Sequence, residues 1–246
     1  MKNFLTEIPI AHRGLHREGL PENSMGAFAA AVEAGYAIET DVRFTKDRKL
    51  VLFHDDDLRR LTGNEPEVLD CTFAELKELR LEGTDEQIPA FEELLRIADG
   101  KAPLLIEIKS MNGITGKEIA EAVAAEIDRV GFKGEYAIQS FNPDYVKSYK
   151  KIRPKILCGI LSSRTVSDSD FKPPFRWFKK FVVRNMALNF QVKPDFISYL
   201  FSNYPNRLTD KFKGPKLAWT VRSPEDEAYA RKYADNIIFE NFIPKQ

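Results

Sequence analysis

The sequence predicts a single closed (β/α)8 barrel of the TIM type, for three reasons. Eight short apolar, β-branched runs alternate with stretches of helical periodicity, which is typical of a parallel sheet with helical crossovers. The 246 residues contain no Gly/Ser-rich linker, so one barrel domain is expected over 1–246. Polar residues gather at the carboxyl ends of the runs, where such a barrel has its open mouth. The predicted strands are 8–12, 37–42, 103–109, 136–140, 155–161, 196–200, 217–221 and 237–240.

Helical periodicity fills the intervals between these strands. Asn23 or Ser24 can cap the first helix, and Gly35 can end it in a left-handed conformation. The chain ends soon after the eighth strand, so no full eighth helix is expected. The predicted helices are 24–34, 91–98, 115–130, 143–151, about 175–189, 204–211 and 224–234.

A ninth apolar run, 50–54, breaks the alternation. Only 45–49 separates it from the second strand, which is too short for a helical crossover, so it is expected to return as an antiparallel hairpin. A turn centred on Asp47 and Arg48 would set Asp41 opposite His54. The segment 55–89 holds one amphipathic stretch, 73–81, and is predicted to be a small insertion over the C-terminal face of the barrel.

Composition and charge exclude several classes of protein. Lys and Arg together number 37, and Asp and Glu together also number 37, so no overall basic field would recruit nucleic acid. No apolar run approaches the length of a membrane span, and the N-terminus does not resemble a secretory signal. The two cysteines, Cys71 and Cys158, are far apart, which argues against a disulfide scaffold or a thiolate zinc site. These features predict a cytoplasmic protein.

Three acidic residues lie at the predicted mouth. Glu39 and Asp41 are two residues apart on the second strand, so their carboxylates share one face, as do the side chains of Glu107 and Lys109 on the third. Three inward carboxylates repel one another unless a counter-ion is present, and hard divalent cations such as Mg²⁺ or Ca²⁺ prefer oxygen ligands. The sequence therefore predicts one divalent cation held by these acids. The alternative is a buried salt-bridge network with Lys109 and Arg13.

Two of the three histidines also end strands at this mouth. His12 and His54 can divide the roles of general base and general acid on either side of a phosphorus, because imidazole titrates near neutral pH. Arg13 and Lys109 can hold the non-bridging oxygens of a phosphate. His16 lies in a polar loop and is interpreted as a solvated loop residue. These groups predict a phosphodiesterase rather than a carbohydrate enzyme, which would need only paired carboxylates.

The order of the motifs resembles the glycerophosphodiester phosphodiesterase family. The segments AHRG, PENS followed by AF, IETDV, LVLFHDDDLRRLTG, IPAFEELL, IEIK, QSF and AWTV carry the resemblance over nearly the whole chain. It implies a barrel of the phosphatidylinositol phospholipase C type that hydrolyses glycerophosphodiesters to glycerol 3-phosphate and an alcohol. It also implies that a cyclic phosphate forms before water attacks, although the residues alone allow direct attack by water.

Carried over residue by residue, the resemblance implies an acid/base pair, three metal ligands and two phosphate contacts at the positions named above. Trp219 matches a position that packs against the glycerol end of the substrate, and Gln139 is placed among the substrate-binding residues. Two departures stand out: the hairpin turn reads KDRK where the family commonly has a glycine, and the last strand reads NIIFEN. Glu240 is left without a role. The acid/base pair is His12 and His54, the metal ligands are Glu39, Asp41 and Glu107, and the phosphate contacts are Arg13 and Lys109.

Two alternative functions remain open. One is a lysophospholipase D, or a lyase that stops at the cyclic phosphate; the other is a barrel that binds a phosphorylated ligand without catalysis. The segment 171–189 mixes aromatic and basic residues, which suits membrane contact. Its spacing favours instead a crossover helix that buries Phe175, Phe178 and Val182. The expected partner is a small-molecule substrate, and the sequence does not indicate an oligomeric state.

Overall fold

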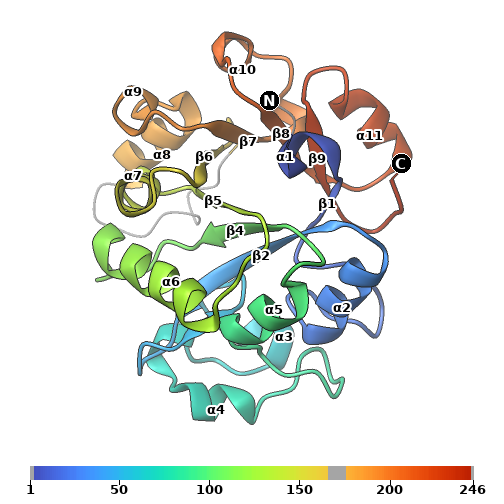
Figure 1. The fold of residues 1–246 in the computed structure, drawn as a ribbon, viewed down its shortest axis with the longest axis vertical. Coiled ribbons are helices and arrows are strands. Elements are labelled where there is room, and N and C mark those ends of the chain that lie inside the picture. The colour runs from blue at the N-terminus through green and yellow to red at the C-terminus, as the bar shows by residue number, and fades with distance from the viewer. Residues whose placement is uncertain (1–2, 166–175, 245–246) are drawn as a thin grey trace.

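The computed structural model describes residues 3–165 and 176–244 and shows a barrel of eight parallel strands closed on itself, with one extra strand (Figure 1). In chain order the strands are β1 (Ile10–Ala11), β2 (Ala37–Phe44), β3 (Leu50–Leu52), β4 (Leu104–Ile108), β5 (Tyr136–Ser140), β6 (Leu157–Ser162), β7 (Phe196–Leu200), β8 (Lys216–Val221) and β9 (Asn236–Phe239). β1 pairs in parallel with both β2 and β9, which closes the cylinder. The predicted fold class is confirmed.

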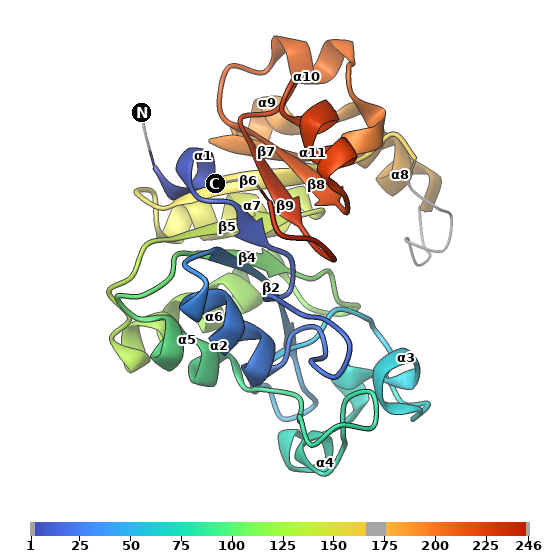
Figure 2. The same ribbon diagram turned by 90° about the vertical axis from the view of Figure 1, so that its right-hand side faces the viewer.

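Helices surround the sheet on its outer side (Figures 1 and 2). α6 shows why they form: Thr115 caps it, Ile119, Val123 and Ile127 are buried at helical spacing, and Gly131 ends it with φ 73°. No helix within the described ranges is long and apolar enough to cross a membrane. The helices are α1 (Phe4–Glu7), α2 (Met25–Glu33), α3 (Arg59–Thr62), η1 (Val68–Asp70), α4 (Phe73–Lys77), α5 (Phe91–Ala98), α6 (Gly116–Val130), α7 (Pro143–Ile152), α8 (Arg176–Asn185), α9 (Asn189–Val192), η2 (Phe201–Asn203), α10 (Arg207–Lys211) and α11 (Pro224–Ala230).

The barrel interior is divided into an apolar lower layer and a polar upper layer. Because side chains alternate along a strand, residues two apart point the same way, and each strand changes character over that step. Leu105 is followed by Glu107, Ala37 by Glu39, and so on around the barrel. The lower layer is one buried cluster that includes Ile10, Ala37, Leu105, Ala137, Phe196, Leu217 and Ile238.

The short helix α1 contributes to this lower layer. Phe4 and Leu5 are 5% and 0% exposed and belong to the same apolar cluster as the lower-layer residues of the strands. Asn3 caps the helix through a hydrogen bond from the Leu5 amide. No helix is predicted here from the sequence, because four residues give too little periodicity to recognise.

The hairpin forms as predicted, but with a different register. β3 is antiparallel to β2, with Val42 opposite Leu52, so Asp41 faces Phe53 and not His54. The predicted pairing is therefore wrong by one residue, since the turn is centred on Asp47 alone. The insertion 55–89 packs around its own buried cluster, which includes Leu58, Leu61, Val68, Leu76 and Leu81.

Other predicted boundaries change at strand and helix ends. The first strand is shorter than 8–12. Within the predicted helix 204–211 only 207–211 is helical, as α10, and η2 precedes that range. In the region predicted as one helix over 175–189, the described residues form α8 and α9. Val182 is buried as expected, but Phe178 is 47% exposed, so its predicted burial is wrong, and Phe175 lies outside the described residues.

Candidate active site

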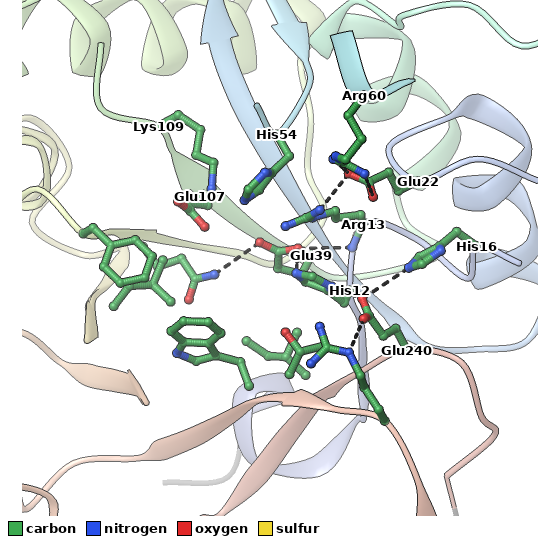
Figure 3. Close-up of a pocket in the computed structure, with 17 residues that line it drawn as sticks. His12, Arg13, His16, Glu22, Glu39, His54, Arg60, Glu107, Lys109 and Glu240 are labelled. Carbon is green, nitrogen blue, oxygen red and sulfur yellow. Dashed lines mark hydrogen bonds and ion pairs between the residues drawn. The ribbon is translucent and has the colours of Figure 1, made fainter. Parts of the chain in front are cut away.

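A cavity of about 450 Å³ opens at the carboxyl ends of the strands. Its lining includes eight of the nine site residues that the sequence predicts, and Figure 3 shows the labelled ones pointing toward a common space. The ninth, Asp41, lies in contact with two of the lining residues, Arg13 and Lys109. The lining residues from the prediction are His12, Arg13, Glu39, His54, Glu107, Lys109, Gln139 and Trp219.

Glu39, Asp41 and Glu107 meet at the base of this cavity. Asp41 on β2 is the direct neighbour of Glu107 on β4, and Glu39 lies one inward position below Asp41. One carboxylate oxygen of each residue lies within 4.8 Å of those of the others, and the three residues are 2%, 1% and 6% exposed. Burial together with repulsion from Asp41 and Glu107 raises the pKa of Glu39 well above its ordinary value. Burial also raises the pKa of Glu107.

Two cations lie against these acids. Lys109 Nζ is 2.7 Å from Glu107 Oε1 and 3.1 Å from Asp41 Oδ1, and Arg13 Nε is 3.2 Å from Asp41 Oδ2. Burial favours the protonated form of Asp41, but Lys109, His54 and Arg13 outweigh it and hold the pKa of Asp41 well below its ordinary value. The salt-bridge network that the sequence analysis weighed as an alternative is therefore present.

The network has more acids than cations. Three carboxyl groups face two cations, and Arg13 also donates to Glu22 Oε1 at 2.7 Å. Glu39 has neither of these cationic groups within ion-pair distance and accepts instead from the Arg13 backbone amide at 3.1 Å and from Gln139 Nε2 at 3.4 Å. Buried oxygen ligands that outnumber their cationic partners fit a hard divalent cation.

His12 is held in one orientation by Glu240. The His12 Nδ1 atom lies 2.5 Å from Glu240 Oε2. The other oxygen of Glu240, Oε1, accepts a hydrogen bond from Arg222 Nε at 2.6 Å. A carboxylate can only accept, so Nδ1 carries the proton and Nε2, 4.0 Å from Glu39 Oε2, is left with its lone pair toward the cavity. Burial and the nearby Arg13 lower the pKa of His12.

Glu240 and His16 are two of the residues at this mouth to which the sequence assigned no role there. His16 Nε2 lies 3.4 Å from Glu240 Oε2, and its side chain is 17% exposed. The interpretation of His16 as a solvated loop residue is wrong, because the loop after β1 folds back against the end of β9. Closure of the barrel brings the first and last strands together, and no local sequence pattern predicts which of their residues come into contact.

His54 is held in the same manner by its chain neighbour. Nδ1 lies 2.7 Å from Asp55 Oδ1, and Asp55 accepts from Arg60 Nε at 2.6 Å. Arg43 holds the backbone by donating to the His54 carbonyl oxygen at 2.6 Å. Burial and the nearby Lys109 lower the pKa of His54 below its ordinary value. Both histidines are thus held by a carboxylate through Nδ1, and both line the cavity.

Asn23, in the PENS motif, has a role that differs from the predicted cap. Ser24 caps α2, while Asn23 Nδ2 donates to Asp41 Oδ2 at 2.9 Å. Asn23 is itself fixed by Thr40 Oγ1 at 2.8 Å. Because two of the four lone-pair sites of Asp41 are already satisfied by Asn23 and Lys109, the carboxylate is fixed before any ligand arrives.

One wall of the cavity is apolar. The Trp219 ring meets Phe141 edge-on at 5.6 Å between centroids, and Leu161 lies on the same lining. Gln139, by contrast, is 1% exposed and bonded to Ser198 and Glu39. Trp219 thus lies on the apolar wall of the cavity, and Gln139 on β5 lies beside Glu107 on β4 at the same level of the barrel.

Comparisons with known proteins agree on one family. A model of the glycerophosphoryl diester phosphodiesterase family matches residues 12–244. A glycerophosphodiester phosphodiesterase of Caldanaerobacter subterraneus subsp. tengcongensis is 34% identical over 162 residues, which are 63% of this chain and 66% of that protein. A human lysophospholipase D is 35% identical over 127 residues, which are 46% of this chain and 40% of that protein.

The fold has a solved counterpart. A phosphodiesterase from Oleispira antarctica, solved in complex with the product sn-glycerol-3-phosphate, superposes with a TM-score of 0.79. The match covers 97% of this chain and 95% of the other at 22% identity. At that identity the likeness concerns the architecture, which is a parallel barrel in both proteins.

Proposed function

This chain belongs to the glycerophosphoryl diester phosphodiesterase family, and from that premise we propose that it hydrolyses glycerophosphodiesters by acid/base catalysis between two histidines at a cation-binding mouth. Enzymes of this family are phosphoric diester hydrolases, and this chain is one of them. The proposal concerns the substrate, the cation and the roles of the residues. Its products are glycerol 3-phosphate and an alcohol.

Glu39, Asp41 and Glu107 would hold the cation. Burial and mutual repulsion raise the pKa values of Glu39 and Glu107, and the three acids outnumber the two cations Lys109 and Arg13. Both observations support this assignment. A divalent cation bound there would supply electrostatic stabilisation for the extra negative charge of phosphoryl transfer. Both Mg²⁺ and Ca²⁺ suit a set of carboxylate oxygens.

Arg13 and Lys109 would contact the phosphate. Both side chains reach the cavity, and both are already anchored by acids on one side, so their remaining N–H groups are oriented before substrate binds. Trp219 would pack against the glycerol end of the substrate on the apolar wall. Gln139 would act indirectly, by holding Glu39.

His12 and His54 would transfer the protons. One neutral imidazole removes the proton from the attacking hydroxyl through Nε2. The other, after taking up a proton from solvent at Nε2, delivers that proton to the leaving alcohol oxygen as the bond to phosphorus breaks. The attacking hydroxyl is either a glycerol hydroxyl of the substrate, which gives a cyclic phosphate that water then opens, or water itself. The observation that carries the proposal is that two imidazoles, each fixed through Nδ1 by a carboxylate, line the same cavity as the buried acids.

A substrate panel tests this function. We expect glycerol 3-phosphate to be released from glycerophosphocholine and glycerophosphoethanolamine in the presence of Mg²⁺ or Ca²⁺, and chelator to stop the reaction. The measurement is coupled detection of glycerol 3-phosphate, with bis(p-nitrophenyl) phosphate as a diester that lacks glycerol. Turnover in chelator equal to that in metal, or no glycerol 3-phosphate from any diester, would contradict the proposal.

A second candidate is a lysophospholipase D, supported by the match to the human enzyme of that name. The two reactions share the same bond cleavage and differ in the acyl chain on the glycerol. Release of choline from lysophosphatidylcholine, with none from glycerophosphocholine, would favour this second candidate.

A further inference from the structure

Exposed large apolar side chains concentrate in one part of the described chain. Five such residues are exposed: Trp177 (73%), Phe178 (47%), Phe181 (53%), Phe190 (71%) and Ile243 (66%). Three of them lie on α8, where Trp177 and Phe178 also contact each other edge-on at 5.9 Å between centroids. A run of exposed aromatics is unusual on a protein surface that faces only water.

These aromatics occupy one face of α8. At 3.6 residues per turn, Trp177, Phe178 and Phe181 fall within about 100° of arc, and Lys180 and Arg184 fall on one flank of that arc. Val182 and Val183, 6% and 5% exposed, lie outside that arc, and Ser162 Oγ on β6 donates to the Val183 carbonyl at 2.7 Å. The helix thus buries one face in the usual way and presents a second apolar face outward. We call Trp177, Phe178, Phe181, Lys180 and Arg184 the aromatic-basic face.

The stretch of sequence that carries this face is basic. Residues 176–193 contain five basic residues, Arg176, Lys179, Lys180, Arg184 and Lys193, and no acidic residue. The whole chain has a formal net charge of zero, so this concentration is local. A second copy of the same face would bring positive charge against positive charge, which disfavours a symmetric dimer here. An anionic surface is the complementary partner.

α8 also lies on the side of the barrel where the active site opens. In Figure 2 it projects beyond the strands on the side toward which the arrowheads of β7 and β8 point. α3 lies on that side as well, and its residue Arg60 lines the cavity. A surface that touched the aromatic-basic face would therefore be near the cavity mouth.

We propose that α8 docks this enzyme onto an anionic phospholipid membrane. Trp177, Phe178 and Phe181 would enter the boundary between headgroups and acyl chains, while Lys180 and Arg184 would lie against anionic headgroups. The inference goes beyond the proposed function, because it concerns where the enzyme binds and not which bond it breaks. Docking would place the cavity next to the membrane from which diesters and lysophospholipids derive.

Vesicle co-sedimentation tests the docking. We expect the full chain to bind vesicles of phosphatidylglycerol and phosphatidylcholine and to bind pure phosphatidylcholine far less. Trp177→Ala combined with Phe181→Ala should weaken binding by about tenfold or more, because the buried apolar area is lost. Ile243→Ala, an equally exposed side chain elsewhere, should have no effect. Arg184→Glu should weaken vesicle binding by about fivefold or more. Lys117→Glu, at an exposed position on α6, should leave vesicle binding unchanged.

Two further measurements separate docking from catalysis and from folding. Trp177 and Trp219 are the two tryptophans, so in Trp219→Phe the fluorescence of Trp177 should shift to the blue on anionic vesicles. Turnover of soluble glycerophosphocholine should be unchanged in Trp177→Ala/Phe181→Ala, which shows that the variant folds. Equal binding to neutral and anionic vesicles, or α8 variants that bind like the wild type, would overturn the proposal. So would α8 variants that turn a dimer into a monomer without changing vesicle binding.

Discussion

Glu240 shows how much one carboxylate determines at this site. It accepts from both His12 Nδ1 and Arg222 Nε, so both of its oxygens are engaged as acceptors. This arrangement fixes the tautomer of His12, and a change of one atom in Glu240 would alter it.

Glu240→Gln is expected to lower kcat by about 10²- to 10⁴-fold although the shape of the side chain is kept. The single amide oxygen would stay with Arg222, so the amide nitrogen would donate to His12 Nδ1 and move the ring proton to Nε2. Adding Arg222→Met should restore part of the activity, because the freed amide can turn its oxygen to Nδ1. Steady-state kinetics with glycerophosphocholine and the ¹⁵N shifts of the His12 ring report both effects.

The double variant is the control for this argument. If Glu240→Gln retains wild-type kcat, Glu240 does not set the tautomer. If Arg222→Met makes the loss larger, Arg222 acts on the substrate and not through Glu240.

At the level of single residues, the sequence predicts the site where polar residues end apolar strands. Glu39, Asp41 and Glu107 could be placed together because strand geometry has a fixed period of two. Glu240 and His16 could not be connected to His12, since that contact depends on closure between β1 and β9. Asn23 was visible as a cap candidate, but its contact with Asp41 depends on tertiary packing.

At the level of elements, periodicity predicts the long helices and fails for short ones. α5 has the predicted bounds, and α6 differs by one residue, because each has an apolar face several turns long. α1 is too short to give a pattern. The hairpin register is shifted by one because the number of residues between strands does not specify which turn they form.

Gly159 on β6 is expected to be intolerant of any side chain. A Cβ there would lie 2.3 Å from the ring of Phe196, which is fully buried in the lower layer beside it. Gly159→Ala should therefore lower the free energy of unfolding by about 1–3 kcal/mol, measured by urea denaturation. Phe196→Leu in the same chain should recover part of that loss.

A double-mutant cycle of Gly159→Ala and Phe196→Leu tests whether the two residues act through direct contact. Contact between the residues predicts a favourable coupling free energy of about 0.5 kcal/mol or more. Strictly additive effects would mean that Gly159 is needed for its backbone conformation and not for the space that Phe196 occupies.

For the whole molecule, a divalent cation bound by Glu39, Asp41 and Glu107 would make stability depend on the metal. A ligand that binds only the folded chain stabilises it by about 2.7 kcal/mol at one hundred times its dissociation constant. We expect Mg²⁺ or Ca²⁺ to raise Tm relative to chelator. His54→Ala should keep that increase and lose turnover, whereas Glu39→Gln should lose both. Differential scanning calorimetry in metal and in chelator measures the increase.

In chelator, Glu39→Gln is expected to have the opposite effect and to raise Tm. The pKa of Glu39 is raised in the folded state by burial and by Asp41 and Glu107, so above the ordinary pKa its ionised form destabilises the fold. In chelator near pH 8, Glu39→Gln should therefore melt above the wild type. A lower Tm in chelator together with an unchanged response to metal would remove Glu39 from the cation site.

The two layers of the barrel interior separate the residues that stabilise the fold from the residues that line the cavity, within each strand. Leu105 and Glu107 are two residues apart, yet Leu105 packs in the apolar lower layer of the barrel and Glu107 lines the cavity. Laboratory evolution toward new diesters can therefore vary the upper ring and the loops while the floor is left as it is. Insertions and deletions within a strand have a different effect. One residue added to β4 would turn the inward side chains outward, and the outward ones inward, along the rest of that strand. Changes of length can therefore accumulate only in the connections between strands and helices.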